Sequence, residues 1–292
     1  MMSNMSDIKT DTNSRTTRSH HAARPWWQRL FIALLAIYLG VMGAIMLFEE
    51  KLVYHPHAYP YGDWKLPERA EDVNFTALDG TRLHGWFFAQ DKPQTVILYL
   101  HGNGGNVAMW AFEGQRLREQ QQAAVFVFDY RGYGRSEGSP SEQGILSDAR
   151  GARAWLAQRT GVAERDVVLV GRSLGTGAAV DLAATDGARG VILISPYTSL
   201  PDIARGVYPW LPAHWLMRNR FDSASKIANY HGPLLVFHGT ADTLIPTTLG
   251  QRLFEAANEP KRFVPLQGAQ HNESPRREYD VAIKEFLSGL SK

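Results

Sequence analysis

The stretch Gly171-Arg172-Ser173-Leu174-Gly175 decides how the rest of the chain is interpreted. A β-branched, apolar run at 167–170 precedes it and small residues at 175–184 follow it, which predicts a strand, a sharp turn and a helix. The two glycines suit a crowded turn, because larger side chains would collide with a neighbouring strand or helix. The pattern is typical of a nucleophile elbow, in which Ser173 is strained and exposed and the amide of Leu174 points into the same space. Taken alone, the motif also fits an ordinary glycine-rich turn.

Apolar strands alternate with helical patterns along most of the chain. A hairpin signal, Asp79-Gly80, joins two strand-like runs at 72–78 and 82–89. The sequence predicts six further strands, at 95–100, 124–128, 167–170, 191–194, 234–237 and 262–265. Strands buried on both faces and joined by helical crossovers indicate a mainly parallel sheet flanked by helices, so the expected fold class is α/β. The globular domain is expected to span 71–292.

The composition is that of an ordinary globular protein, with 292 residues, 44% hydrophobic and 21% charged. A net charge of +2 is too small to indicate nucleic acid as a partner. The chain contains no cysteine, which excludes disulfides, thiolate metal sites and a cysteine nucleophile. The glycine-rich segments 101–106 and 132–137 complete neither the P-loop nor the Gly-x-Gly-x-x-Gly pattern, which argues against a nucleotide or redox enzyme.

The glycine-rich loop at 101–106 directly follows the predicted strand 95–100. With a nucleophile elbow downstream, we interpret this loop as one side of an oxyanion hole. The backbone amide of Asn103 is expected to converge there with the amide of Leu174. Donors in such a site stabilise negative charge that develops only in the transition state.

A serine hydroxyl is a poor nucleophile until a base removes its proton, and the base is usually a histidine oriented by a carboxylate. Ten histidines are present, and position in the fold selects His271, which lies just after the last predicted strand. Asp242 follows the strand before that one. A loop aspartate or histidine is usually only solvated. Ser173, Asp242 and His271 nevertheless stand at three strand ends in the order of a Ser-Asp-His triad, which predicts a catalytic constellation.

Five segments resemble the α/β-hydrolases, and more narrowly the Bem46-like, ABHD13/ABHD17-type serine hydrolases close to the S33-peptidase-like group. The segments are HGNGGN at 101–106, DYRGYGRSEG at 129–138, GRSLG at 171–175, HGTADTLIP at 238–246 and GAQHN at 268–272. This resemblance covers about 50–292. It implies a sheet of about eight strands, a Ser173-Asp242-His271 triad, ester or thioester substrates that are often lipid-like, and neither a cofactor nor a metal.

The chain begins with a polar segment that precedes a long apolar run. We expect 1–29 to be a disordered tail, 30–48 to be a transmembrane signal anchor and 49–70, which is rich in proline, to be a juxtamembrane linker. Interfacial aromatic residues flank the apolar run. A cleaved signal peptide is the main alternative and a transit peptide a weaker one, but the run is long and no Ala-x-Ala site follows it.

Charge around the apolar run favours one orientation. More arginine and lysine residues lie before it than after it: Arg15, Arg18, Arg24 and Arg29 precede it, and Lys51 and Lys65 follow it. This bias predicts a cytoplasmic tail and a catalytic domain across the membrane, which would be periplasmic in a bacterium. A stripe of small residues in the run, Ala36, Gly40 and Ala44, is also compatible with a weak homodimer through the span.

A short insertion at about 198–232 is expected to form a cap over the carboxyl ends of the strands, where loops shape the pocket. Its apolar residues are candidates for an acyl pocket or for contact with the bilayer, and plain packing against the domain is the alternative. These residues are Trp210, Leu211, Trp215, Leu216 and Met217.

The sequence therefore predicts a membrane-anchored serine hydrolase that cleaves an acyl ester or thioester, with a lipid or acyl small molecule as its substrate. A peptidase or amidase with the same triad is the alternative within enzymes. A catalytically silent hydrolase-like module that binds lipid or protein is the alternative outside them, and the complete triad argues against it.

Overall fold

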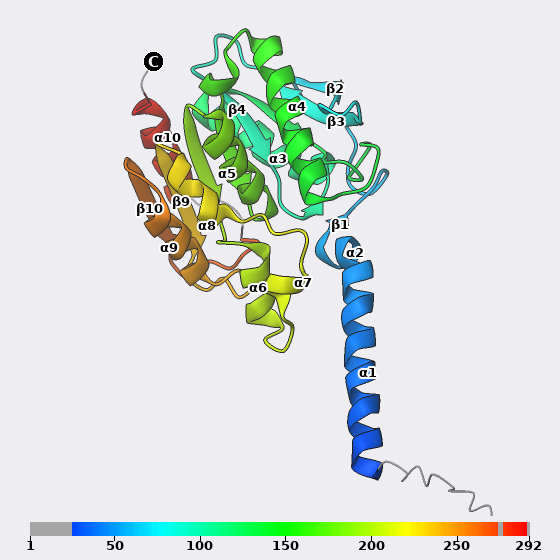
Figure 1. Cartoon of the computed structure of the whole chain (residues 1–292). Helices are drawn as coiled ribbons and strands as arrows, with labels where there is room; N and C mark the ends of the chain where they lie inside the picture. The colour runs from blue at the N-terminus through cyan, green and yellow to red at the C-terminus, as the bar shows by residue number, and fades with distance from the viewer. Residues whose placement is uncertain (1–24, 274–276, 291–292) are drawn as a thin grey trace, which may run out of the picture. The chain divides into compact units, whose positions relative to one another are not determined.

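The computed structural model describes residues 25–273 and 277–290 (Figure 1). Most of the tail predicted at 1–29 therefore lies outside the described residues. The chain divides into two units, 1–45 and 46–292. Helix α1, Trp26–Leu47, is 22 residues long and is the one described helix that is long and apolar enough to cross a membrane. It starts within the predicted tail and ends one residue before the predicted end of the span.

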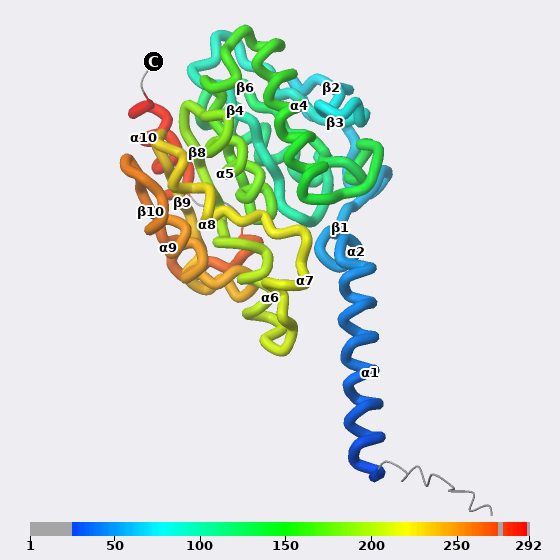
Figure 2. The backbone as a smooth tube through the Cα atoms, viewed as in Figure 1, coloured from blue at the N-terminus to red at the C-terminus, as the bar shows by residue number. Residues whose placement is uncertain are grey.

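The second unit is built on an eight-stranded sheet with the order β10-β9-β8-β7-β4-β6-β3-β2. Antiparallel pairing is confined to the β2–β3 and β3–β6 pairs, and the other strands are parallel, as predicted. The tube in Figure 2 shows the side-by-side run of β8, β9 and β10. The strands are β2 Ala70–Thr76, β3 Arg82–Phe88, β4 Thr95–Leu100, β6 Ala123–Phe128, β7 Val168–Arg172, β8 Gly190–Ile194, β9 Leu234–Gly239 and β10 Lys261–Leu266. The short strands β1 His55–Pro56 and β5 Gly104–Gly105 pair separately.

Alternate residues of each central strand point to opposite sides of the sheet, and both sets are apolar. Helices therefore cover both faces of the sheet. On β4, Leu98 packs into one core with α4, α5 and α9, whereas Ile97 and Tyr99 pack into the other with α3 and α10. The α-helices of this unit are α2 Glu49–Val53, α3 Val107–Gln121, α4 Glu142–Thr160, α5 Leu174–Asp186, α6 Leu200–Val207, α7 Ala213–Leu216, α8 Ser223–Lys226, α9 Thr247–Ala256 and α10 Arg277–Ser288. Two 3₁₀ helices lie at Glu164–Asp166 and Ile227–Asn229.

The segment 49–70 differs from the expected linker, because the compact unit starts at Met46 rather than at residue 71. The carboxylate of Glu49 is buried and accepts hydrogen bonds from the backbone N–H groups of Arg218 and Asn219. The hydroxyl of Tyr54 donates to the side chain of Asn219 at 2.8 Å. The prolines in this segment do predict a lack of long regular elements, but its anchors are contacts with residues more than 160 positions away, which no local pattern reveals.

The cap region between β8 and β9 is short, as the spacing of the strands predicts. It contains α6, α7, α8 and the second 3₁₀ helix. These elements follow the carboxyl end of β8 and therefore lie at the same edge of the sheet as the turn that contains Ser173, which follows β7.

Candidate active site

Ser173 stands in the turn between β7 and α5 with φ of 49° and ψ of −117°. A positive φ is uncommon for a residue with a side chain, and such strain persists only where the surroundings fix it. The turn is fixed by close packing of its two glycines. A Cβ on Gly175 would lie 2.0 Å from the carbonyl oxygen of Leu100, and one on Gly171 would lie 2.6 Å from the carbonyl oxygen of Gly175. The structure thus has the strained elbow that the motif predicts.

The structure brings together the three predicted catalytic side chains. Nε2 of His271 lies 3.0 Å from the hydroxyl oxygen of Ser173, and Nδ1 of His271 lies 2.7 Å from Oδ2 of Asp242. Asp242 follows β9, and His271 follows β10. The carboxyl ends of neighbouring parallel strands meet at one edge of the sheet, which explains how residues up to 98 positions apart converge.

Asp242 is held as a carboxylate. Burial raises its pKa, but the nearby side chain of His238 and the hydrogen bonds from His271 and the backbone of Ile245 outweigh burial and hold the pKa well below its usual range. Oδ1 accepts the N–H groups of Leu244 at 3.0 Å and Ile245 at 2.8 Å. An ionised Asp242 assigns the proton of His271 to Nδ1, which leaves Nε2 free to accept the proton of Ser173. The arrangement can therefore activate a serine hydroxyl.

The oxyanion loop passes directly beside the serine. A Cβ built on Gly102 would lie 3.6 Å from Cβ of Ser173. The predicted donors are the backbone N–H groups of Asn103 and Leu174, and neither donates a hydrogen bond to a described part of the chain. Leu174 is the first residue of α5, so the helix dipole also favours negative charge at this point. Both amides therefore remain candidates for the oxyanion hole that the sequence predicts.

The side chain of Asn103 ties the oxyanion loop to the segment that precedes the domain core. Nδ2 donates to the carbonyl oxygen of Val53 at 2.6 Å, and Oδ1 accepts the N–H of His55 at 3.2 Å and the hydroxyl of Tyr133 at 2.9 Å. The β1–β5 pairing joins the same two segments. Sequence reasoning does not find His55 and Tyr133 as supports of the site.

Arg172 is a second support that the sequence does not indicate. Its Nη2 donates to the carbonyl oxygen of His271 at 3.0 Å, and its guanidinium lies 5.5 Å from the centre of the Trp110 ring. Nη1 lies 3.9 Å from the buried carboxylate of Glu113. The residue next to Ser173 therefore holds the loop that carries His271.

The predicted acyl-pocket residues differ in how much of each is exposed. Trp215 is 89% exposed and Trp210 is 55% exposed, whereas Leu211, Leu216 and Met217 are half-buried. A side chain inside an enclosed pocket would be covered, so the structure does not place the two indoles in one. Within 25–273 and 277–290, no group of three or more histidine, aspartate or glutamate residues is arranged to hold a metal ion.

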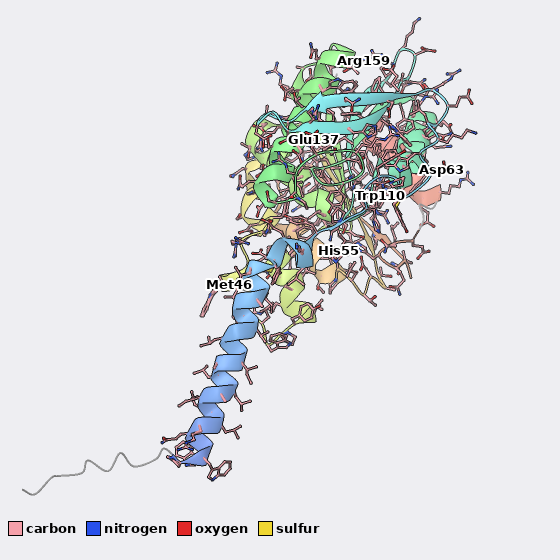
Figure 3. The ribbon with its side chains drawn as sticks, turned by 90° about the vertical axis from the view of Figure 1, so that its right-hand side faces the viewer. Met46, His55, Asp63, Trp110, Glu137 and Arg159 are labelled. Carbon is pink, nitrogen blue, oxygen red and sulfur yellow. The ribbon has the colours of Figure 1, made fainter. Side chains whose placement is uncertain are left out.

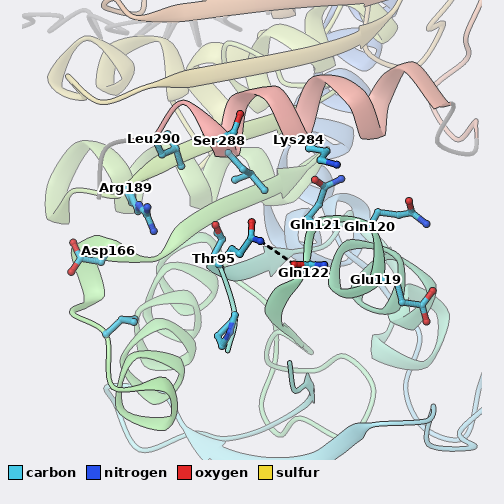
Figure 4. A pocket seen from close by; sticks show the side chains of 14 residues that line it. Thr95, Glu119, Gln120, Gln121, Gln122, Asp166, Arg189, Lys284, Ser288 and Leu290 are labelled. Atoms are coloured by element: carbon cyan, nitrogen blue, oxygen red, sulfur yellow. Dashed lines mark hydrogen bonds between the residues drawn. The ribbon is translucent and has the colours of Figure 1, made fainter. Parts of the chain in front are cut away.

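Two hollows lie at different distances from Ser173, Asp242 and His271. A small one of about 20 Å³ lies beside it and is lined in part by Arg172, Ser195 and His271. A wide groove of about 1020 Å³ lies at the opposite, amino-terminal edge of the strands (Figure 4), where Thr95 begins β4 and Gln121 ends α3. This groove is lined mainly by polar and charged side chains and is far from the elbow, so it is not where Ser173 acts.

Comparisons with known proteins agree with the fold. The family model described as "alpha/beta hydrolase fold" matches residues 95–224. A protein of Mycobacterium tuberculosis (strain ATCC 25618 / H37Rv) is 38% identical over 264 residues, which cover 88% of this chain and 92% of that protein. The "Alpha/beta hydrolase domain-containing protein WAV2" of Arabidopsis thaliana is 30% identical, with 90% of this chain and 94% of the relative covered.

Solved structures show the same fold. The esterase PF2001 of Pyrococcus furiosus superposes with a TM-score of 0.66 at 19% identity, covering 82% of this chain and 97% of the esterase. Acetyl xylan esterase 1 of Thermoanaerobacterium sp. gives a TM-score of 0.61 at 18% identity, covering 79% and 87%.

Proposed function

The chain belongs to the α/β hydrolase family, and we propose that within it the protein is a membrane-anchored serine hydrolase that cleaves a lipid-like acyl ester or thioester. The observation that carries this proposal is the hydrogen-bonded series from Ser173 through His271 to Asp242. The esterases among the structural neighbours are compatible with it. The Bem46-like type is the subgroup that we propose, because the juxtamembrane segment that belongs to that resemblance packs against the site.

The reaction follows from the positions of the side chains. Oγ of Ser173 attacks the acyl carbon while Nε2 of His271 takes its proton, and the oxyanion binds the amides of Asn103 and Leu174. His271 returns the proton to the leaving alcohol or thiol as the ester or thioester bond breaks. A water molecule then loses a proton to His271 and attacks the acyl-enzyme, which releases the acid and restores Ser173.

Membrane anchoring is assigned to α1. At about 1.5 Å per residue, its 22 residues span roughly 33 Å, enough for a hydrocarbon core of ~30 Å. A signal sequence near an N-terminus has similar properties, and the lack of an Ala-x-Ala site after the apolar run favours an uncleaved anchor. We place the catalytic domain on the non-cytoplasmic side, and Leu211, Leu216 and Met217 are the cap residues that we assign to acyl contact.

A hydrolysis screen tests the activity. The full chain is assayed with short- and long-chain acyl esters, acyl thioesters and aminoacyl amides, and we expect turnover of esters or thioesters. Asp242→Asn should lower kcat by about 10⁴-fold, because an amide N–H facing Nδ1 of His271 holds the imidazole in the tautomer whose Nε2 carries a proton and cannot accept that of Ser173. The double variant Ser173→Ala/His271→Ala should be little worse than either single variant, since residues that act as a unit are not additive. Turnover of aminoacyl amides alone would replace the esterase with a peptidase or amidase.

A further inference from the structure

Two short segments bring exposed apolar side chains onto the unit that starts at Met46. In the first, at the end of α1, Leu47 is 80% exposed and Phe48 53% exposed, and Leu52 is exposed as well. In the second, the cap segment 207–216, Tyr208 is exposed along with Trp210 and Trp215. Single exposed apolar residues are common on protein surfaces, but a concentration of them marks an interaction site.

Glu49 joins the two segments. Its carboxylate is 3% exposed and accepts the backbone N–H groups of Arg218 at 2.9 Å and Asn219 at 2.8 Å, together with Nε of Arg218 at 3.2 Å. Nη2 of Arg218 also donates to the carbonyl oxygen of Met46 at 3.2 Å. Burial raises the pKa of Glu49, but the hydrogen bonds from Arg218 and Asn219 outweigh burial and lower the pKa below its usual value. The group is therefore a carboxylate. The chain that returns from the cap is thus fixed to the residues that directly follow α1.

Chain connection then places the cap close to lipid. If α1 spans the bilayer, Leu47 and Phe48 reach the edge of the hydrocarbon core, and Glu49 is the next residue. Trp215 is three residues before Arg218, a chain distance of at most roughly 11 Å. The headgroup layer beyond the hydrocarbon is about 5–8 Å thick on each side. The exposed indole of Trp215 therefore lies close, along the chain, to the residues that directly follow α1.

The chemistry of the two segments suits a lipid headgroup layer. Tryptophan and tyrosine favour this layer, because the ring is apolar while the indole N–H or hydroxyl contacts water. Arg218 and Lys51 are exposed cations in the same two segments and match lipid phosphates, with Glu50 as an exposed acid beside Lys51. An enclosed acyl pocket does not explain an indole that is 89% exposed.

We propose that residues 46–52 and the cap segment 207–216 form one bilayer-contact surface, which docks the catalytic unit on the membrane that α1 crosses. This inference rests on the proposed membrane anchoring. In Figure 1, α6 and α7 lie at the lower end of the compact unit, and Figure 3 shows Met46 and His55 at the lower end of the same unit and Arg159 at the upper end. The cap also belongs to the edge of the sheet that carries Ser173. Docking by this surface holds the active-site edge next to acyl chains in the bilayer.

The absence of cysteine from the chain makes the test clean, since single cysteines can be labelled without other changes. Full-length Trp210→Cys, Trp215→Cys, Ile37→Cys and Gln120→Cys variants are nitroxide-labelled and reconstituted into phosphatidylcholine/phosphatidylglycerol vesicles. The collision rate of each label with oxygen, which partitions into lipid, is compared with that of a water-soluble nickel complex. Gln120 is the matched control, because it is exposed on the amino-terminal edge of the sheet, opposite the cap (Figure 4). Circular dichroism checks that each variant is folded, and Tyr208→Cys replaces a cap variant that is not.

We expect the label at 37 to report the hydrocarbon core, the labels at 210 and 215 to show an oxygen-to-nickel ratio several-fold above that at 120, and the label at 120 to report water. Labels at 210 and 215 that match 120 while 37 is in lipid would overturn the docking surface but leave the anchor intact. A label at 37 that reports water would overturn the membrane anchoring as well. A hydrolase screen without turnover is a separate failure, because it concerns Ser173 rather than the surface.

Discussion

The surroundings of Ser173 fix its backbone conformation, and those of Asp242 fix its ionisation state. The backbone of Ser173 is held at φ of 49° by glycines that have no room for a methyl group, so its hydroxyl stands clear of the sheet. Asp242 is buried, yet two backbone N–H groups and His271 keep it ionised. The strain at Ser173 and the burial of Asp242 both cost free energy. Contacts within the protein, rather than contacts with a substrate, offset that cost.

The state of Asp242 leads to a prediction for the pH profile. Because the pKa of Asp242 lies well below its usual range, this carboxylate stays ionised throughout the acid limb of kcat/KM. Asp242 therefore contributes no ionisation to this limb. We expect the logarithm of kcat/KM for a water-soluble ester to rise with a slope of one on that limb. A slope of two would mean that Asp242 titrates over the same range.

At the same scale, the sequence locates the reacting groups but not their supports. Asp242 and His271 could be selected because each directly follows a strand, and strand ends converge at one edge of a parallel sheet. The roles of Arg172 and of the Asn103 side chain could not be predicted. Arg172 bonds a carbonyl 99 positions away and Asn103 bonds residues about 50 positions away, and such contacts depend on the assembled structure.

At the scale of elements, the closeness of α5 to β4 depends on one glycine. A methyl group at Gly175 would lie 2.0 Å from the carbonyl oxygen of Leu100, whereas one at Gly206, in α6, would meet nothing within 4 Å. We expect Gly175→Ala to lower the free energy of unfolding by about 3 kcal/mol or more. Gly206→Ala should change it by less than about 1 kcal/mol and in the stabilising direction. Urea denaturation of both variants measures the difference, and equal stabilities would contradict the packing described for the elbow.

The segment from α2 to β1 is an element of the active site rather than a spacer. A chain 46–292 keeps the contacts of Val53 and His55 with Asn103, whereas a chain 71–292 loses them. We expect a fluorophosphonate probe to label 71–292 at least about tenfold more slowly, the equivalent of ~1.4 kcal/mol in the barrier. The chain 46–292 is the control for loss of α1. Equal labelling of the two chains would show that the segment does not position the oxyanion loop.

Sequence patterns predict the strands more accurately than they predict the structure of the segment 49–70. The predicted strand 95–100 agrees with β4 at both ends, and 234–237 lies inside β9, because buried strands have a continuous apolar signal. The segment 49–70 has no such signal. From the sequence alone, its prolines and the acidic residue Glu49 are those of a linker. The burial of Glu49 becomes apparent only from its contacts with the cap.

At the scale of the whole molecule, the apolar helix α1 precedes a hydrolase unit that we propose to lie across the membrane from the tail. The excess of arginine before residue 30 predicts a cytoplasmic tail and a catalytic domain on the other side. Protease added to sealed spheroplasts, or to vesicles of known sidedness, distinguishes the two orientations. We expect the domain to be digested wherever the non-cytoplasmic face is exposed. Protection of the domain under those conditions would reverse the orientation, and lysed membranes are the control for protease access.

Ser173 should be a covalent nucleophile, and a fluorophosphonate probe that forms an adduct with such a serine measures this property itself. The full chain should react once, and mass spectrometry should place the adduct on the peptide that contains Ser173. Ser173→Ala should remove the labelling while circular dichroism stays native. Undiminished labelling of a natively folded Ser173→Ala variant would contradict the account.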